Sequence, residues 1–133
     1  MTIRYPTATG PSSITLDFPP LLNHYYRTAV VNRHAQTYVS KRGKAYREYV
    51  AARWADVGRT YTGDVKMVIA ATYPDRRPRD LDGIFKSLLD SLEYAGAYKN
   101  DNQVKHIDAW VEGVEKPGFV VVSIARIPPW PSV

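Results

Sequence analysis

Residues 65–96 have the sequence VKMVIAATYPDRRPRDLDGIFKSLLDSLEYAG, which decides most of the fold. Apolar and polar side chains alternate over residues 65–73, the pattern of a strand with one buried face. A basic connection follows, and apolar residues then recur at helical spacing until Gly96, which is placed to end a helix. We therefore expect a strand, an exposed connection and a helix that begins near Asp80 or Asp82.

The flanking sequence predicts three further strands and a second helix. Residues 13–18 alternate between apolar and polar side chains, as a half-buried strand does. Ser40 is a good helix N-cap, and the proline-free run up to Trp54 has helical periodicity. Residues 104–111 and 119–127 are expected to form a hairpin across a Pro-Gly turn. The expected buried residues of the two helices are Tyr46, Val50, Trp54 and Val57, and Ile84, Phe85, Leu88, Leu89 and Leu92.

The order of these elements predicts the fold class. Residues 21–33 fit either a loop or a short strand, and residues 36–39 fit a short extended segment. Strand, helix, strand, helix and hairpin together predict an α+β fold, in which two helices cover a mixed sheet in a two-layer arrangement. We expect one domain over residues 1–133, with its core at about 13–127 and a proline-rich tail at 128–133.

Charge is distributed unevenly along the chain. The formal net charge is +5, and residues 24–79 hold 12 Lys and Arg against 4 Asp and Glu, whereas residues 80–133 hold 5 against 8. A positive field attracts phosphate backbones, so nucleic acid is the expected partner. The alternative is that these cations only keep the surface soluble.

Composition also excludes several classes of function. The chain has no cysteine, which rules out disulfides, thiolate zinc sites and a cysteine nucleophile. The scattered histidines lack the spacing of zinc ligands. No apolar run approaches the roughly 20 residues that span a bilayer, and the N-terminus does not resemble a secretory signal. We therefore expect a cytoplasmic protein with no membrane partner.

Acidic side chains beside the basic run suggest a site for a divalent cation. Asp80 and Asp82 project to the same side if their segment is extended, and Asp101 lies in a later loop. Mg²⁺ prefers carboxylate oxygens and keeps several waters, so two or three converging acids suffice. A bound ion would polarise a phosphoryl oxygen and activate a water, while Lys86 could stabilise the developing negative charge.

Each acid also has an ordinary structural interpretation. Asp82 could be a plain helix N-cap, and Asp80 could pair with Arg77 or Arg79. Aspartates such as Asp101 are common in turns. For an isolated Asp-x-Asp sequence these interpretations are the more common ones, so the pair alone does not define a function.

The lysine has a structural alternative as well. Lys86 could form an ion pair with Asp82 or Asp90 along one helix face, worth only a few tenths of a kcal/mol. Asp90 lies about two turns beyond Asp82, so we expect a supporting role or solvent exposure for it rather than direct metal binding. The combination of acids and lysine is more specific than any one of these residues.

An ordered series of motifs over residues 13–127 resembles the RusA-like Holliday junction resolvases, which are small Mg²⁺-dependent endonucleases of bacteria and their phages. The motifs are Ile14-Thr15-Leu16-Asp17-Phe18-Pro19-Pro20, Asn23, Tyr25-Tyr26-Arg27, Val39-Ser40, Gly43-Lys44-Ala45-Tyr46-Arg47, Pro74-Asp75-Arg76-Arg77, Arg79-Asp80-Leu81-Asp82, Lys86, Leu89-Asp90, Ala95-Gly96 and Asn100-Asp101-Asn102-Gln103. The resemblance implies cleavage of four-way junctions or other branched DNA by paired nicks, in the cytoplasm of a bacterial or phage-infected cell. A non-catalytic basic DNA-binding module is the alternative function.

The resemblance also assigns roles to individual residues. It implies that Asp80, Asp82 and Asp101 bind Mg²⁺, with Mn²⁺ as a substitute, and that Lys86 is catalytic together with these acids. Family members often have asparagine where this chain has Gly83, and an acid where it has Asn100. The predicted DNA-binding residues are Arg27, Lys41, Arg42, Lys44, Arg47, Arg76, Arg77 and Arg79.

A homodimer is implied in the same way. A four-way junction has two-fold symmetry, and each chain carries one set of acids, so two copies related by a dyad would present two sites symmetrically. Tyr25, Tyr26 or Phe85 could help to dimerise the protein or act as a wedge at the crossover, although burial in the core is the more common role of such aromatic residues.

Overall fold

A computed structural model describes residues 5–8 and 10–128 of the chain. The elements in chain order are β1 (Ser12–Asp17), α1 (Leu22–Tyr25), β2 (Tyr26–Val31), β3 (His34–Val39), α2 (Lys41–Val57), β4 (Val65–Tyr73), η1 (Leu81–Ile84), α3 (Phe85–Tyr94), η2 (Asp101–Gln103), β5 (Val104–Val114) and β6 (Phe119–Arg126), where η marks a short 3-10 helix. The proline-rich tail falls mostly on residues 129–133, which lie outside the described residues.

Four strands form a mixed sheet in the order β1-β6-β4-β5. Strand β6 pairs antiparallel with β1 and β4, whereas β5 runs parallel to β4. This confirms the predicted α+β fold with a mixed sheet, but the predicted hairpin of β5 and β6 is wrong because β4 lies between them. The physical reason is that β4 has the continuous apolar inner face of a central strand, and α3 supplies the long connection that parallel β5 needs.

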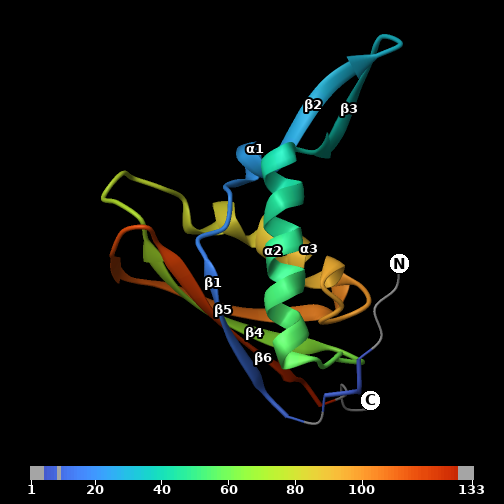
Figure 1. The fold of residues 1–133 in the computed structure, drawn as a ribbon, viewed down its shortest axis with the longest axis vertical. Coiled ribbons are helices and arrows are strands. Elements are labelled where there is room, and N and C mark those ends of the chain that lie inside the picture. The colour runs from blue at the N-terminus through green and yellow to red at the C-terminus, as the bar shows by residue number, and fades with distance from the viewer. Residues whose placement is uncertain (1–4, 9, 129–133) are drawn as a thin grey trace, which may run out of the picture.

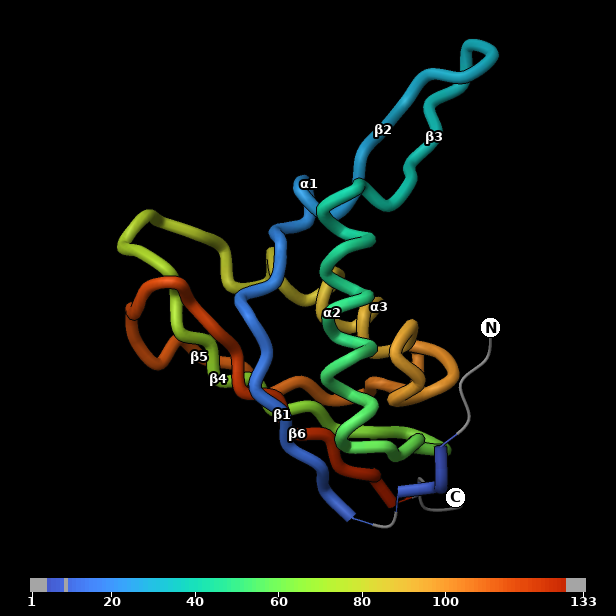
Figure 2. The backbone as a smooth tube through the Cα atoms, in the orientation of Figure 1, coloured from blue at the N-terminus to red at the C-terminus, as the bar shows by residue number. Residues whose placement is uncertain are grey.

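The two long helices cover one face of this sheet (Figures 1 and 2). Ser40 caps α2 as expected, because its Oγ accepts a hydrogen bond of 3.0 Å from the Gly43 N–H. Trp54 of α2 is fully buried and donates through Nε1 to the Arg59 carbonyl at 2.8 Å. The apolar face of α3 packs against α2, and Gly96, with a φ of +88°, ends α3 in the left-handed conformation that glycine favours.

Most of the predicted helix stripes are buried. Tyr46, Val50, Trp54, Ile84, Leu88 and Leu92 belong to the core, whereas Val57, Phe85 and Leu89 are only partly buried. No helix in the described part of the chain is long and apolar enough to span a membrane.

Strands β2 and β3 form a separate two-stranded sheet, which resolves the ambiguous segment in favour of strands. Figure 1 shows this hairpin projecting from the N-terminal end of α2, away from the main sheet. Its base is the short helix α1, a third helix that the sequence pattern did not predict. Tyr25, at the end of α1, is fully buried, so it belongs to the core and cannot act as a wedge.

Candidate active site

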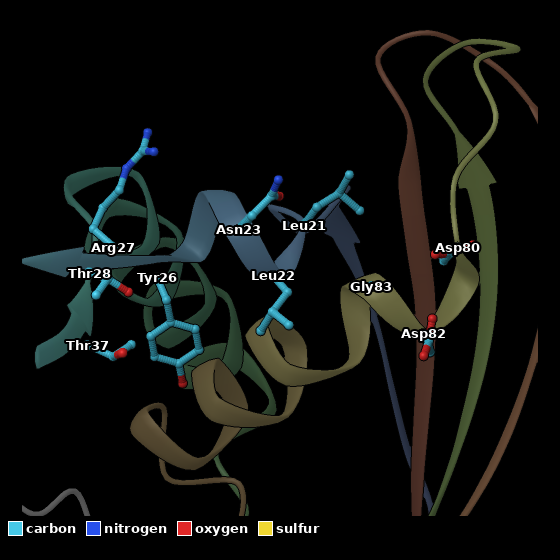
Figure 3. Close-up of a pocket in the computed structure, with 10 residues that line it drawn as sticks. All are labelled: Leu21, Leu22, Asn23, Tyr26, Arg27, Thr28, Thr37, Asp80, Asp82 and Gly83. Carbon is cyan, nitrogen blue, oxygen red and sulfur yellow. The ribbon is translucent and has the colours of Figure 1, made fainter. Parts of the chain in front are cut away.

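The predicted acids Asp80 and Asp82 line a surface hollow between the hairpin base and the start of the α3 segment. Figure 3 shows the two carboxylates and Gly83 on one side, with residues of α1 and β2, including Tyr26 and Arg27, on the other. The helix begins at Leu81, between the two acids, so Asp80 is extended and Asp82 lies in η1. Both acids are exposed.

Asp80 and Asp82 do not have the structural roles, ion pair and helix N-cap, that were the alternatives to metal binding. Among the described residues, the carboxylates of Asp80 and Asp82 form no hydrogen bond or ion pair, and no side chain caps η1. Arg77 and Arg79 pair with Asp75 instead, each at 2.8 Å. The cap and ion-pair interpretations are therefore wrong, and both acids keep their full capacity to accept a ligand.

The basic connection before Asp80 is held in place by Arg79. Its guanidinium contacts Asp75 at 2.8 Å, donates to the Asp75 carbonyl at 3.2 Å, and lies over the Tyr73 ring at 5.4 Å. The side chain is only 9% exposed. Hydrogen bonds from Arg77, followed by those from Arg79, hold the pKa of the Asp75 carboxyl well below its usual range. Arg79 therefore fixes the backbone that leads into Asp80.

Lys86 and Asp101 form a second, adjoining part of the site. The Lys86 Nζ donates to Asp101 Oδ2 at 3.2 Å, so the lysine does not pair with Asp82 or Asp90. Partial burial lowers the pKa of the Lys86 ammonium, but the hydrogen bond and the charge of Asp101 outweigh this effect and raise the pKa above its ordinary value. Lys86 is therefore protonated at neutral pH.

Glu93 holds Asp101 from the other side. Its Oε1 accepts a hydrogen bond of 2.7 Å from the Asp101 N–H. The same loop is fixed by Asn100, whose Oδ1 accepts from the Asn102 N–H at 2.9 Å, and by Gln103, which donates to the Gly63 carbonyl at 2.8 Å. Sequence reasoning missed Glu93. Its position in the last turn of the helix that precedes the acidic loop was the available signal.

Asp90 supports the hairpin base, in agreement with one of the two expectations for it. The Tyr25 hydroxyl donates to Asp90 Oδ2, and Arg47 lies 4.0 Å from the same oxygen. Burial and this hydrogen bond raise the pKa of Tyr25, so the phenol stays neutral. Tyr26, next in sequence, lines the hollow, and burial followed by the charge of Asp90 raises its pKa too.

The donor set fits Mg²⁺ at two carboxylates but not at three. Within residues 5–8 and 10–128, no three His, Asp or Glu side chains lie close enough together to hold an ion. Asp80 and Asp82 share one hollow, whereas Asp101 is bonded to Lys86. Mg²⁺ often binds one or two protein carboxylates together with substrate phosphates, so the pair in the hollow is a suitable donor set.

The predicted DNA-binding residues fall into three groups. Arg27, Lys41 and Arg42 line a second hollow at the hairpin base, and Lys44, Arg76 and Arg77 are exposed. Arg47 lies 4.7 Å from the centre of the Tyr94 ring, and Arg79 is buried as described above. Charge alone therefore did not distinguish open cations from those that hold the fold together.

Gly83 lies between Asp82 and the first buried residue of the helix. A Cβ atom at this position would meet Leu21 Cδ2 at 3.4 Å, an ordinary contact. A side chain at position 83 would therefore not clash with its neighbours, so the packing does not require glycine there. The site also accommodates Asn100 in place of the acid, because its side chain caps η2.

Carboxylates beside a lysine on a basic protein are typical of enzymes that cleave phosphodiesters. The family model described as Endodeoxyribonuclease RusA matches residues 17–125. The crossover junction endodeoxyribonuclease RusA of Escherichia coli K12 is 42% identical over 119 residues, which are 86% of this chain and 94% of the relative. The enzymes of the same name from Enterobacteria phages HK97 and 82 are 38% and 40% identical, over 77% and 86% of this chain and 83% and 93% of their own lengths. The chain belongs to the RusA family of endodeoxyribonucleases.

Proposed function

We propose that this protein is a Mg²⁺-dependent endodeoxyribonuclease that resolves Holliday junctions and other branched DNA by paired nicks, in the recombination and repair of bacterial or phage DNA. The observation that supports this most strongly is the pair of open carboxylates in the hollow, followed four residues after Asp82 by a lysine whose charge is maintained by Asp101. Membership of the RusA family, together with the names of the relatives, supports the branched substrate.

The reaction adds water across the P–O3′ bond and leaves 5′-phosphate and 3′-hydroxyl ends. Asp80 and Asp82 would hold Mg²⁺, or Mn²⁺ as a substitute. Asp101 would act through Lys86, because its Oδ2 accepts a hydrogen bond from the ammonium and so holds this positive charge in place. When bound, the ion polarises a phosphoryl oxygen and lowers the pKa of a water.

The protein's own side chains supply positioning and charge. The Lys86 ammonium stabilises negative charge that develops on the phosphoryl oxygens. The buried Arg79 fixes the backbone before Asp80, and Glu93 fixes the backbone of Asp101, so neither acid depends on the DNA for its placement. The open cations Arg27, Lys41 and Arg42 bind the phosphate backbone around the hollow.

We further propose that the protein acts as a homodimer. The described residues of each chain place one pair of acids, Asp80 and Asp82, in a hollow, whereas a four-way junction is resolved by two symmetric nicks. Two copies related by a dyad meet this requirement. Sedimentation velocity over a range of protein concentrations tests the dimer, and a monomer under conditions of full cleavage activity would contradict it.

Cleavage of a synthetic four-way junction tests the proposed activity. The purified protein is incubated with the junction and with linear duplex of the same sequence, each with Mg²⁺ and with EDTA. We expect paired nicks in the junction only when Mg²⁺ is present, and little cleavage of the duplex. Junction binding without any cleavage in Mg²⁺ or Mn²⁺ would contradict the proposal and favour a non-catalytic DNA-binding module.

A further inference from the structure

The β2–β3 hairpin buries too little of its own surface to contribute to the core. Nearly every residue of both strands is exposed or only half-buried, on both faces of the ribbon. Val30 is 76% exposed and Tyr38 is 50% exposed. An isolated two-stranded ribbon is marginally stable in water, so little in the arm itself fixes its outer part.

The base of the hairpin is nevertheless fixed to the body of the protein. The Ser40 N–H donates to the Tyr25 carbonyl at 2.8 Å, and the Ser40 hydroxyl donates to the His24 carbonyl at 2.6 Å. Gly43 allows this close approach, because a Cβ atom there would lie 2.5 Å from the Tyr25 carbonyl oxygen. The hairpin is therefore an arm with a defined direction (Figure 2).

The tip of the arm presents a cation. Asn32 and Arg33 have φ values of +50° and +66°, which are the conformations of a tight two-residue hairpin turn. The pairing of Val31 with His34 closes this turn. Arg33 thus lies at the far end of the arm, roughly 20 Å from Arg27 at about 3.3 Å per residue.

Charge complementarity identifies the kind of partner. Residues 18–47 contain six Lys and Arg and no Asp or Glu, counted along the printed sequence. One face of the ribbon carries Arg27 and Tyr38. This face continues into the second hollow, at the hairpin base, which Lys41 and Arg42 also line. An acid-free arm with cations at its base and at its tip matches a polyanion, and β-ribbons enter DNA grooves in other proteins.

The opposite face leads to the candidate active site. Thr28 pairs with Thr37, and both line the hollow that contains Asp80 and Asp82. The same ribbon therefore spans from the scissile phosphate to a point roughly 20 Å away, further than the width of a major groove, which is about 12 Å. If one duplex is cut in the hollow, the tip therefore lies beyond one groove width from the cut, where a second duplex is available at a branch point.

We propose that the β2–β3 arm contacts a second duplex at the branch point, and that this contact gives the enzyme its preference for branched over linear DNA. The inference rests on the proposed function. The cations at the base of the arm, Arg27, Lys41 and Arg42, bind one phosphate backbone, and Arg33 at the tip reaches the neighbouring duplex. The arm thus sets substrate selectivity and takes no part in the chemical step.

Shortening the arm tests this inference. Deleting the paired residues Ala29, Val30, Ala35 and Gln36 removes two residues from each strand, keeps the turn and the alternation of faces, and changes no charge. We expect junction affinity to fall about tenfold or more, while linear-duplex affinity stays within about twofold. Equal affinities of the shortened and wild-type proteins for the junction would overturn the inference.

A point variant tests the tip without altering the length. Arg33→Gln should weaken junction binding and reduce the slope of log K against log salt by about 0.9, the effect of one lost phosphate contact. Arg59→Gln is the matched control, because Arg59 is exposed beyond the opposite end of α2. An unchanged salt slope for Arg33→Gln, or an equal loss for Arg59→Gln, would contradict the role of the tip.

Two further results separate this inference from the proposals on which it rests. If sedimentation velocity shows that the shortened protein no longer dimerises, the arm binds a second copy of the chain and the inference is overturned. If the wild-type protein does not cut the junction but the shortened arm still lowers junction affinity, the proposed nuclease function fails and the arm's DNA contact is supported.

Discussion

Asp82 and Asp101 are acids of the same candidate site, but they differ in how the protein holds them. Asp82 is exposed in the hollow and, within the described residues, its carboxylate forms no hydrogen bond or ion pair with another side chain. Asp101 receives a hydrogen bond from Lys86 on its carboxylate, and Glu93 accepts one from its backbone N–H. The first acid is open to a ligand, whereas the second is already engaged. The candidate site thus has one part with a carboxylate open to a ligand, at Asp82, and one part whose side chains already contact one another, at Asp101.

The largest effect is expected at the open part. Asp82→Asn should abolish junction cleavage, by roughly 1,000-fold or more, because one ligand of a two-carboxylate metal site is lost. Junction affinity should be retained, since the basic surface is unchanged. Single-turnover cleavage and gel-shift binding measure the two effects.

Asp108→Asn is the matched control for this variant. Asp108 lies on β5 and pairs with Lys66 at 3.7 Å, outside the hollow, so the same change of charge should leave cleavage at the wild-type rate. Cleavage by Asp82→Asn at the wild-type rate would rule out Asp82 as a metal ligand.

The next largest effect is expected at Lys86. Lys86→Gln removes the charge that we propose stabilises the phosphoryl oxygens, and the loss of one such group typically costs roughly 100-fold to 1,000-fold in rate. Because the pKa of Lys86 is raised, the wild-type rate should not rise or fall through deprotonation of this lysine between pH 6 and 9. The pH profile of single-turnover cleavage by the wild type checks this expectation. A wild-type cleavage rate for Lys86→Gln would contradict a catalytic role of Lys86.

Glu93 should have a moderate effect, because it acts only through Asp101. Glu93→Ala removes the acceptor of the Asp101 N–H, and we expect about a tenfold loss of cleavage rate with no change in junction affinity. Glu93→Gln keeps an amide oxygen as acceptor and should restore the rate. Equal losses in both variants would show that the charge of Glu93 matters, and not its hydrogen bond.

The smallest effect is expected at Asp75, whose side chain is 37% exposed, so that solvent screens its ion pairs. Its folded-state pKa is lowered, so its contribution to stability is present above the unfolded value of about 3.9 and is lost as pH falls through the folded value. Asp75→Asn should therefore melt at a slightly lower Tm than the wild type at pH 7, and the difference should shrink as the pH falls below about 3.9. A Tm difference that grows at acidic pH would contradict this sign.

Local sequence patterns predicted the elements that bury one face. The strand over residues 65–73, the Ser40 cap and the Gly96 stop are all confirmed. The β2–β3 arm was ambiguous because both of its faces are exposed, so no hydrophobic alternation marks it. The β5–β6 hairpin was wrong because its turn is a local signal, whereas the insertion of β4 between the two strands depends on burial across the whole sheet.

The sequence predicted the residues of the candidate site but not the hydrogen bonds and ion pairs that hold them. The motif series located Asp80, Asp82, Lys86 and Asp101, and the roles of these residues stay predictions. Spacing did not reveal that Asp75 engages the arginines or that Glu93 holds the acidic loop, because both contacts depend on how the chain turns between the partners. Charge counts likewise could not separate the buried Arg79 from the open Arg27.

The central claim is that a divalent cation binds between Asp80 and Asp82, and localised radical cleavage tests it most directly. Fe²⁺ is bound in place of Mg²⁺ and treated with ascorbate and peroxide, and the sites of backbone cutting are mapped by mass spectrometry. We predict cuts near residues 80–83 and at the facing wall, residues 21–28, which excess Mg²⁺ and Asp82→Asn both suppress. Cuts elsewhere, or a pattern that Asp82→Asn leaves unchanged, would contradict the claim.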